Sequence, residues 1–292
     1  MHRVAAVRRF NRMVTQRVGA LDDRFLSLDR PLGEARLLWE IGAEDRRDVR
    51  SLRAQLGLDS GYLSRMLRSL ERERLVHVEP RPEDRRVRTA RLTAKGRAER
   101  ALLDTRSDEL AASLLAPLNG GQQERLVSAM EEVERLLTAG MVEIAPADPA
   151  HPHARHCMAE YFAELGRRFE PGLDPATSIP TEPEDLRPPA GLLLMARLRG
   201  EPVGCGALRF YEPERPDIKR LWVDPRVRGL GLGRRLVAEL EARALSGGAR
   251  AVRLDTNRSL TEAIAMYRAA GYVEVEPFND EPVAHHWFEK RL

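Results

Sequence analysis

Three glycines at positions 229, 231 and 233 alternate within the stretch VDPRVRGLGLGRRLVAEL, which runs from Val223 to Leu240. The stretch lies between a strand-like run and a helix-like run, and four arginines flank the glycines. Glycine lets a backbone approach a ligand closely, and successive amides at a helix N-terminus bind anions. The pattern therefore predicts a strand-to-helix junction at which main-chain amides and arginines hold a phosphate-rich ligand.

Two common phosphate-binding loops do not fit this stretch. A P-loop requires Gly-Lys-Ser/Thr, whereas this chain has Gly-Arg-Arg. A dinucleotide-binding loop requires G-x-G-x-x-G and an acidic residue about 20 residues further on. Here the spacing is G-x-G-x-G, and no acidic residue ends a second strand at that distance. A glycine-rich connection without any ligand stays open as an alternative.

The order Arg226-Val-Arg-Gly229-Leu-Gly231 resembles the acyl-CoA loop of the GNAT superfamily of N-acetyltransferases, Gln/Arg-x-x-Gly-x-Gly/Ala. The later stretch LDTNRSLTEAIAMYRAAGYVEV resembles the second signature of that superfamily, in which a strand, Asn, a helix, Tyr and Gly-aromatic follow one another. The resemblance covers about residues 142–292. It implies a mixed α/β (α+β) GNAT fold that binds acetyl-CoA, or another acyl-CoA, and acetylates an amine.

The same resemblance assigns roles to individual residues. Backbone amides from about 228 to 234 are expected to bind the CoA pyrophosphate, and splayed strands at 218–223 and 251–256 to admit the pantetheine arm. The backbone near Val223 would polarise the acetyl carbonyl, and Tyr267 would protonate the leaving thiolate; a core tyrosine is the alternative. The expected cofactor-binding residues are Leu221, Trp222, Val223, Arg228, Gly229, Leu230, Gly231, Leu232, Gly233, Arg234 and Asn257, the last of which could instead cap a helix.

A general base for the acceptor amine is not evident in the sequence. The carboxylates of Asp217, Glu212 and Glu160 stand in suitable positions, but we expect each to be a solvated charge. Many enzymes of the superfamily use a chain of water molecules instead, so the lack of a clear base does not argue against activity.

Two groups of histidines could suggest further chemistry. His153, His156 and Cys157 are close in sequence, but Pro152 interrupts them and no carboxylate or second cysteine completes a site, so we expect no metal. His285 and His286 are adjacent in an expected strand, where neighbouring side chains face opposite sides and cannot share a ligand.

The first half of the chain predicts a helix-turn-helix. One helix ends at Gly57, and a second opens with Asp59 or Ser60 as its N-cap. The second helix would bury Leu63, Met66, Leu67 and Leu70. Its exposed face would present Ser60, Gly61, Tyr62, Ser64, Arg65 and Arg68. The hydroxyls and arginines among them suit phosphates and base edges. Taken alone, the helix pair could equally be an αα-hairpin with a solvated face.

A basic hairpin follows the helix pair and favours DNA binding. Its tip, PEDRRVR, holds Arg85, Arg86 and Arg88, and arginine at such a tip can reach a minor groove. The segment resembles the winged helix-turn-helix of the MarR family, whose wing pattern is matched in register by Asp84, Arg86, Leu92, Thr93 and Gly96. The resemblance covers roughly residues 5–140. It implies a homodimer formed by the terminal helices, for which the apolar positions of 7–25 and 126–137 are suited, and a two-fold double-stranded DNA operator.

Length and charge agree with two modules. A chain of 292 residues suits two domains, and we expect a winged helix-turn-helix domain, mostly α with a β-wing, over 1–141 and a GNAT domain over 142–292. Residues 46–100 hold 16 Lys and Arg against 8 Asp and Glu, although the whole chain carries only +3. No stretch is long and apolar enough for a membrane span, and the two cysteines do not suggest a disulfide framework, so the cytoplasm is expected.

These patterns predict a transcriptional regulator that is also an acetyl-CoA-dependent N-acetyltransferase acting on a small primary amine or amino acid. The alternative is a DNA-binding regulator whose second domain only senses acyl-CoA. A third possibility is an enzyme whose first domain serves only for dimerisation.

Overall fold

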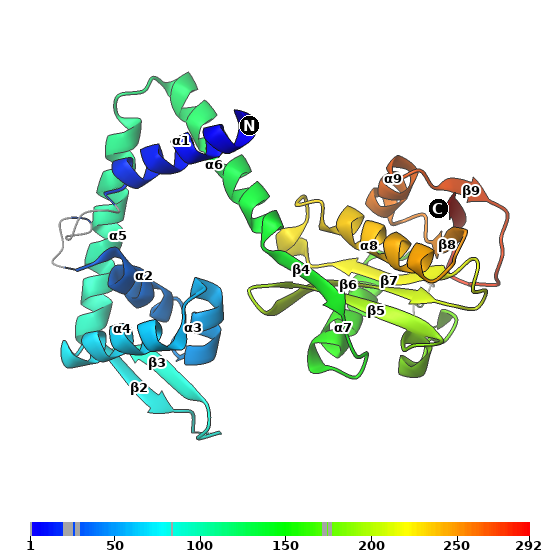
Figure 1. Ribbon diagram of the computed structural model, residues 1–292, viewed down its shortest axis with the longest axis horizontal. Coiled ribbons are helices and arrows are strands. Elements are labelled where there is room, and N and C mark those ends of the chain that lie inside the picture. Colours follow the sequence, from blue (N-terminus) through cyan, green and yellow to red (C-terminus); the bar gives the residue numbers. More distant parts are fainter. Residues whose placement is uncertain (1, 20–25, 27–29, 83, 171–173, 175–176) are drawn as a thin grey trace. The chain divides into compact units, whose positions relative to one another are not determined.

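The chain forms two compact units, Met1–Ala129 and Met130–Leu292. The computed structural model describes residues 2–19, 26, 30–82, 84–170, 174 and 177–292 (Figure 1). The division between the units falls within a long helix, Gly120–Gly140. The expected domain boundary after residue 141 stays a prediction.

The first unit is mostly helical and contains one small sheet. Its strands are antiparallel in the order β1-β3-β2. The elements are α1 His2–Arg17, α2 Leu32–Ile41, β1 Arg47–Asp48, α3 Val49–Leu56, α4 Ser60–Arg72, β2 Val76–Pro80, β3 Arg88–Leu92, α5 Ala94–Leu115 and the start of α6 Gly120–Gly140.

The helix pair α3–α4 forms as the sequence predicted. Gly57 ends α3 in the left-handed region, at φ 62°, which glycine adopts without a steric penalty. The Asp59 carboxylate accepts the Tyr62 backbone N–H at 2.9 Å and so caps α4. The four apolar side chains expected on the inner face are buried: Leu63, Met66, Leu67 and Leu70.

The wing is the hairpin of β2 and β3, which pair from Val76–Leu92 to Pro80–Arg88. At its base the Thr93 hydroxyl accepts the Gly96 N–H at 3.0 Å and caps α5. A Cβ on Gly96 would lie 2.0 Å from the Leu75 carbonyl oxygen. The Thr-x-x-Gly spacing therefore lets the first turn of α5 pack directly against the backbone at the start of β2.

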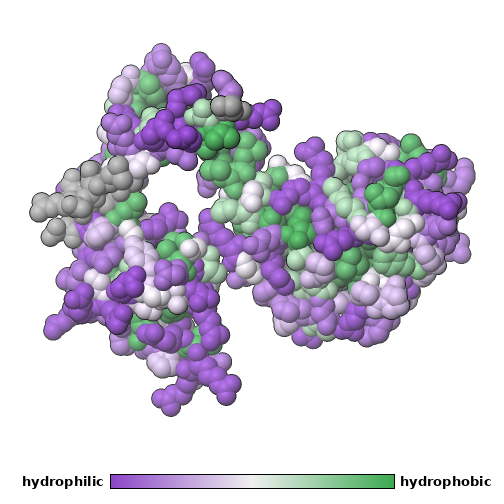
Figure 2. Space-filling model, in the orientation of Figure 1, coloured by the Kyte–Doolittle hydropathy of each residue, from purple (hydrophilic) through white to green (hydrophobic). Residues whose placement is uncertain are grey.

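The helices α1 and α6 leave apolar side chains uncovered within this chain. Neither helix has a buried residue. The helix α1 ends earlier than the apolar spacing predicted, and Leu21 and Phe25 lie outside the described residues. Figure 2 shows apolar surface along α6. The large apolar residues exposed on the two helices are Val4, Val7, Phe10, Met13, Val14, Val127, Met130, Leu136 and Leu137.

The second unit is a mixed sheet with helices on both faces. Its seven strands run in the order β4-β5-β6-β7-β8-β10-β9. The elements after α6 are β4 Val142–Pro146, α7 Pro152–Arg168, η3 Pro183–Leu186, β5 Gly191–Leu198, β6 Glu201–Arg209, β7 Asp217–Val223, η4 Pro225–Val227, α8 Leu232–Ser246, β8 Ala251–Thr256, α9 Thr261–Ala269, β9 Val273–Val275 and β10 His286–Arg291.

Alternating side chains of β5 and β6 build two apolar layers. Leu193 and Cys205 pack with Ala154 and Cys157 of α7 on one face. On the other face, α8 and α9 cover the larger core, whose buried members include Leu194, Leu208, Leu236, Leu240, Ile264 and Phe288. Fold class and element order thus agree with the sequence prediction of a helical winged module followed by a mixed α/β unit (Figure 1).

Candidate functional site

The parallel strands β7 and β8 separate soon after they meet. Their register joins only Asp217 and Arg253, whereas every other neighbouring pair in this sheet is antiparallel. Because the two strands diverge toward their carboxyl ends, backbone groups there are free to meet a ligand. The N-terminus of α8 follows β7 directly, so the predicted splay and the glycine loop lie at the same end of the sheet.

A cavity of about 430 Å³ lies at this end, between β7, α7, α9 and the glycine loop. Its lining includes most of the residues expected to bind the cofactor: Leu221, Trp222, Val223, Arg228, Gly229, Gly231, Leu232, Gly233 and Arg234. We refer to it as the loop cavity.

The glycine loop lies at a strand-to-helix junction, where the sequence predicted it. Gly229 and Gly231 have φ of 79° and 75°, in the left-handed region, and Gly231 is the residue before the first turn of α8. The amide of Arg235 is the first to bond back to this turn, at 3.1 Å to the Gly231 carbonyl. The amides that precede it at the helix start point out of the helix, where an anion is favoured.

A carboxylate holds the entry to the loop. Asp224 is buried and accepts the Arg226 backbone N–H at 2.8 Å and its guanidinium at 2.6 and 3.0 Å. These hydrogen bonds hold the pKa of Asp224 below its usual value. Arg226 was predicted as part of the loop motif, but its pairing with Asp224 was not. We refer to this pair as the Asp224–Arg226 clamp.

Glu164 of α7 forms polar contacts with three side chains on the other side of the loop cavity. Its carboxylate accepts the Trp222 indole N–H at 3.0 Å and forms ion pairs with Arg228 and, at 3.4 Å, with Arg168. Trp222 is therefore a buried anchor rather than a free surface for a ligand. Glu164 was not predicted from the sequence, because two of its partners, Trp222 and Arg228, lie on β7 and in the glycine loop, far from α7 in the chain.

A second cavity, of about 510 Å³, adjoins the first. Tyr161 and Leu221 line both, as do Leu165, Leu260 and Ala263. We refer to the second as the acceptor cavity. The residues shared by the two cavities mark the position at which ligands in the two would meet.

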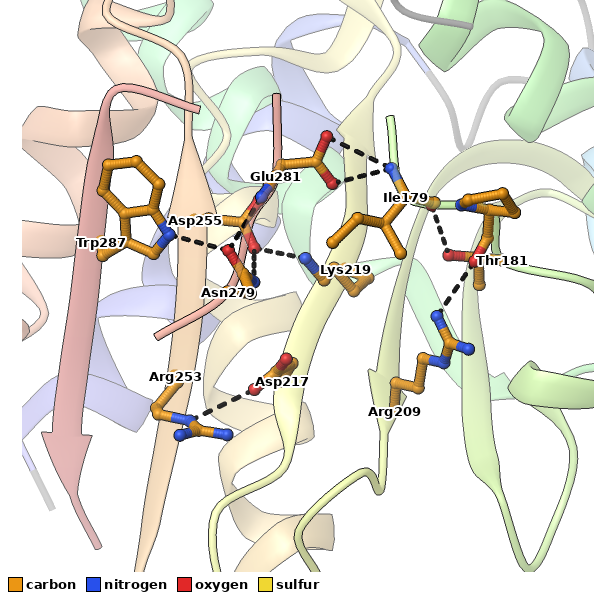
Figure 3. Close-up of polar contacts among 11 residues, drawn as sticks. Ile179, Thr181, Arg209, Asp217, Lys219, Arg253, Asp255, Asn279, Glu281 and Trp287 are labelled. Atoms are coloured by element: carbon orange, nitrogen blue, oxygen red, sulfur yellow. Dashed lines mark hydrogen bonds and ion pairs between the residues drawn. The ribbon is translucent and has the colours of Figure 1, made fainter. Parts of the chain in front are cut away.

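Charged side chains cross the floor of the acceptor cavity from β7 to β8 (Figure 3). The buried Arg253 donates to Asp217 at 3.3 Å and to Glu212 at 3.3 Å. Lys219 forms an ion pair with Asp255. Burial raises the pKa of Asp217 above its ordinary value, although Lys219 and Arg253 oppose this shift.

Asn279 extends this network to the last strand of the chain. Its amide donates to Asp255 at 3.0 Å, and its carbonyl oxygen accepts the Trp287 indole N–H at 2.8 Å. Figure 3 shows Asn279 between these two partners. The polar floor is thus held from β7, β8, β10 and the segment that precedes β10.

Tyr267 of α9 lines the acceptor cavity and is buried, with 6% of its surface exposed. It packs against the rings of Tyr272 and Phe288, so it belongs to the core as well as to the cavity. Burial raises the pKa of Tyr267, with smaller contributions from Tyr161 and Asp255. The phenol therefore stays protonated at neutral pH, as a proton donor must.

Leu230 and Asn257 depart from the predicted cofactor set. Leu230 packs against the core of the second unit and does not line the loop cavity. Asn257 is 3% exposed; its amide donates to the Val283 carbonyl at 2.7 Å, and its oxygen accepts the Ser259 N–H at 2.9 Å. Both polar groups are bonded within the chain, but Asn257 does not cap α9, whose N-cap is Leu260 without a side-chain hydrogen bond. Asn257 lines the acceptor cavity instead of the loop cavity, and its role toward the cofactor stays a prediction.

The carboxylates considered as bases fall into different environments. Asp217 was expected to be solvated, and this was wrong: it is 3% exposed and paired with Arg253. Glu212 is exposed and also pairs with Arg253, whereas Glu160 lines neither cavity. Asp255 of β8, which lines the acceptor cavity and accepts a hydrogen bond from Asn279, was not predicted from the sequence.

The histidines lie apart from a common site. His151 caps α7 through its ring nitrogen, and the following His153 packs against it. His286 contacts Glu274 at 2.6 Å, while burial lowers the pKa of its neighbour His285. Within the described parts of the chain, no group of three or more His, Cys, Asp or Glu is arranged to hold a metal ion.

The residues expected to contact DNA are exposed on two neighbouring elements of the first unit. Six are on α4: Ser60, Gly61, Tyr62, Ser64, Arg65 and Arg68. The remaining three are at the wing: Arg85, Arg86 and Arg88. The Asp84 carboxylate accepts the Arg86 N–H at 3.0 Å and shapes the turn. Figure 2 shows the wing tip as a strongly hydrophilic surface.

Comparison with known proteins connects these two sites to two families. Residues 158–272 match the acetyltransferase (GNAT) family, and residues 31–87 match the MarR family. The chain contains a MarR-family segment followed by a GNAT acetyltransferase domain. The GNAT match includes the glycine loop and Tyr267, and the MarR match includes α4 and most of the wing.

Two curated relatives match the GNAT acetyltransferase domain. An IAA acetyltransferase of Azospirillum brasilense is 38% identical over 86 residues, which are 29% of this chain and 56% of that protein. An uncharacterised N-acetyltransferase of Schizosaccharomyces pombe is 37% identical over 98 residues, 33% of this chain and 60% of that protein. The chain thus spans little more than half the length of these relatives.

Solved structures resemble each part of the chain. A GNAT acetyltransferase from Staphylococcus aureus Mu50 has a TM-score of 0.44 and 16% identity, covering 51% of this chain and 98% of that one. Wild-type MarR from E. coli has a TM-score of 0.38 and 25% identity, covering 43% of this chain and 94% of that one.

Among the described residues, no helix is long and apolar enough to cross a membrane.

Proposed function

We propose that the protein is a cytoplasmic, dimeric, operator-binding regulator whose GNAT domain transfers the acetyl group of acetyl-CoA to a small primary amine or amino acid. The observation that supports the enzymatic part most directly is the junction of two cavities beside a splayed β7–β8 pair. One cavity is lined by the glycine loop, and the other by Tyr267 and a charged floor. Two substrates can therefore approach each other from opposite sides of Tyr161 and Leu221.

The loop cavity suits the anionic end of a CoA thioester. Gly229 and Gly231 leave the backbone amides uncovered, and Arg234 lines the same space, as does Arg228, whose guanidinium also pairs with Glu164. Amides at a helix start and adjacent arginines stabilise phosphate groups together. The apolar residues Leu221, Val223 and Met266 line the remainder, which suits the less polar arm of the coenzyme.

The proposed reaction is a direct transfer. The neutral amine nitrogen attacks the thioester carbonyl carbon, a C–N bond forms, and the C–S bond breaks as the tetrahedral intermediate collapses. The Tyr267 phenol gives its proton to the leaving thiolate, and the nitrogen loses a proton to solvent or to a cavity carboxylate. Holding both substrates at one junction contributes to the rate by orienting them.

Binding and turnover of acetyl-CoA test this proposal, with two glycines as a matched pair. Gly229 and Gly248 have φ of 79° and 91°, and a Cβ on either would meet no atom within 4 Å. Gly229→Ala and Gly248→Ala should each lower the free energy of unfolding by about 1–2 kcal/mol, because both place a side chain in a left-handed backbone. Only Gly229→Ala should also weaken acetyl-CoA binding in calorimetry, by about tenfold or more. Equal affinities in both variants would contradict the loop assignment.

Acetyl-CoA binding without turnover would favour the second candidate, in which the domain only senses acyl-CoA. That candidate is supported by the pairing of Asp217 and Asp255, the two carboxylates that β7 and β8 place in the acceptor cavity, with cations. Thiol release across a panel of amines decides between the two. Release with any amine supports the enzyme, whereas tight binding with no release, together with altered operator affinity, supports the sensor.

A further inference from the structure

The charges of the acceptor cavity do not all have partners within the chain. Of its cationic lining residues, Arg253 pairs with Asp217, Lys219 with Asp255 and Arg209 with Asp185. Arg220 also lines the cavity, but no described carboxylate forms an ion pair with it. A guanidinium in such a position is available to an anionic group of a ligand.

The strand β7 is distorted at this residue. The β6–β7 register passes from Cys205–Trp222 to Ala207–Lys219, so β7 holds an extra residue between them. Arg220 has φ 56°, in the left-handed region that an L-residue adopts at an energetic penalty. A bulge of this kind changes the direction of a side chain, and such bulges are frequent next to active sites.

Aromatic rings of α7 hold the guanidinium of Arg220. Its central carbon lies 4.7 Å from the ring centre of Phe162 and 5.7 Å from that of Tyr161. The Tyr161 hydroxyl also contacts Arg220, although burial dominates and raises the pKa of that phenol. The two rings restrict the position of the group without using its N–H donors in ion pairs. A guanidinium held in this way can bind a carboxylate through two parallel hydrogen bonds.

The position of Arg220 relates this carboxylate to the amine that reacts. Tyr161, which contacts Arg220, lines both cavities, as does Leu221, the next residue of β7. A carboxylate on Arg220 would therefore lie close to the junction where the nitrogen must meet the thioester. Only an acceptor with a short separation between the two groups can satisfy both.

The opposite charge is provided elsewhere in the same cavity. Glu281 is 8% exposed, and its carboxylate accepts the Ile179 backbone N–H at 3.2 and 3.3 Å, with no ion pair among the described residues (Figure 3). Asp280, which is exposed, also lines this cavity and has no ion pair among the described residues. Unmatched carboxylates and an unmatched guanidinium in one cavity complement a zwitterion. A polyamine or an aminoglycoside has no anionic group for Arg220 and would bring further positive charge beside it.

We propose that the acceptor is an α-amino acid or a similarly short amino acid, and that Arg220 is the specificity-determining residue that binds its carboxylate. This inference rests on the proposed acetyltransferase function and specifies its substrate class. Arg220 acts on the position of the acceptor and has no part in proton transfer.

Matched acceptors test the inference with the full-length protein and acetyl-CoA. The panel contains L-phenylalanine, L-leucine, L-arginine and L-lysine, each beside its decarboxylated amine. For at least one pair, kcat/KM of the wild type should be about 10- to 100-fold higher for the amino acid, as a charge-assisted bidentate contact implies. Arg220→Gln should remove that preference, and Arg220→Lys should keep part of it.

Arg199→Gln provides a matched control. Arg199 has φ 54°, close to that of Arg220, but it is exposed at the β5–β6 hairpin and lines neither cavity. Similar thermal unfolding of the two glutamine variants shows that any difference in specificity does not come from folding. Arg199→Gln should retain the full preference for the carboxylate.

Four results overturn the inference, and the last of them also overturns the proposed function. Equal kcat/KM for amino acids and amines in the wild type, or a preference that survives Arg220→Gln, excludes Arg220 as the carboxylate site. If acetyl-CoA binds but no acceptor is acetylated, calorimetry measures the affinity of CoA-loaded protein for the same panel. Equal affinities for an amino acid and its decarboxylated amine again exclude Arg220 as the carboxylate site. If acetyl-CoA itself does not bind, the proposed function fails as well.

Discussion

Asp217 and Arg253 face each other at the single point where the parallel strands β7 and β8 are in register, and their side chains form a buried ion pair at 3.3 Å. Past this pair the strands diverge and the two cavities open. The ion pair therefore joins the strands at the base of the proposed site. Glu212 gives Arg253 a second, more exposed carboxylate at 3.3 Å.

Removal of either partner should destabilise the protein, but to different extents. Arg253→Gln leaves Asp217 buried without its ion-pair partner, and we expect it to lower the free energy of unfolding by about 3 kcal/mol. Asp217→Asn should lower it by about 1 kcal/mol, because Glu212 still neutralises Arg253 and burial already disfavours the Asp217 charge. Urea unfolding measures both. A larger loss for Asp217→Asn than for Arg253→Gln would contradict this account.

The exposed pair of Arg250 and Glu214 offers a control for that comparison. Their side chains are 80% and 62% exposed at 3.5 Å separation. Arg250→Gln should change the free energy of unfolding by no more than about 1 kcal/mol, because water screens such pairs.

The Asp224–Arg226 clamp predicts a pH-dependent effect. The Arg226 hydrogen bonds hold the folded-state pKa of Asp224 below its ordinary value of 3.8. The clamp is therefore fully formed above pH 3.8, and its contribution is lost as the pH falls through the folded-state value. Asp224→Asn should be less stable than the wild type by about 1 kcal/mol at pH 6, since Arg226 is largely exposed.

Urea unfolding of both proteins between pH 6 and pH 3 checks this sign. The difference between wild type and Asp224→Asn should stay constant down to about pH 4 and then shrink. A difference that grows in acid would show that another interaction of Asp224 dominates. Acetyl-CoA affinity at pH 7 should also fall in the variant, because the clamp holds the entry to the glycine loop.

Local patterns allowed much of this architecture to be predicted from the sequence. The left-handed glycines at 57, 229 and 231, and the cap at Asp59, act within a few residues and leave a direct signal. The apolar spacing in α4 also sufficed to predict its buried face. Such features depend on the chain near them, so one sequence is enough to read them.

The acceptor cavity could not be predicted in this way. Arg220 is directed by a bulge that arises from the pairing of β6 with β7, and Glu164 meets partners on β7 and in the loop. Asn257 was assigned to the cofactor by its place in a motif, whereas its contact with Val283 comes from a distant segment. Ion pairs between different strands leave no regular spacing in the sequence. Which charged side chains are paired and which are free is therefore known only from the structure.

Tyr267→Phe tests proton donation to the leaving thiolate. Because burial raises its pKa, the phenol is protonated throughout the neutral range. We expect kcat to fall about 100-fold, within the range of general acid catalysis, while acetyl-CoA affinity stays within about twofold. Thiol release at saturating substrates measures the first quantity and calorimetry the second. Tyr272→Phe alters the neighbouring ring that lines neither cavity, and it should retain the wild-type kcat.

The apolar surfaces of α1 and α6 predict a dimer. Leu137 is 65% exposed in the single chain, and burial in a dimer would explain an uncovered leucine at this position. Leu137→Glu should shift the protein toward monomer in sedimentation analysis, whereas Leu245→Glu, at an exposed leucine of α8, should not. A wild type that sediments as a monomer at all concentrations would exclude the proposed dimer.

The wing and α4 predict a salt-sensitive interaction with DNA. Arg65 and Arg68 on α4 and Arg86 at the wing are exposed and form no ion pair with a described carboxylate, so they are available to phosphates. Each arginine that contacts a phosphate should contribute about 0.9 to the slope of log affinity against log salt concentration. Arg86→Gln should therefore weaken binding to operator and unrelated duplexes alike and reduce that slope by about 1.

Arg106→Gln is the charge-matched control for this measurement. Arg106 is on α5 and pairs with Glu109 at 2.8 Å, away from the wing and α4. The variant should keep the wild-type affinity and slope in titrations of fluorescent duplexes from 50 to 300 mM salt. If Arg86→Gln and Arg106→Gln behave alike, the wing does not contact DNA. If substitutions of Arg65 and Arg68 also left DNA binding unchanged, the first unit would serve the protein as an arm for dimerisation.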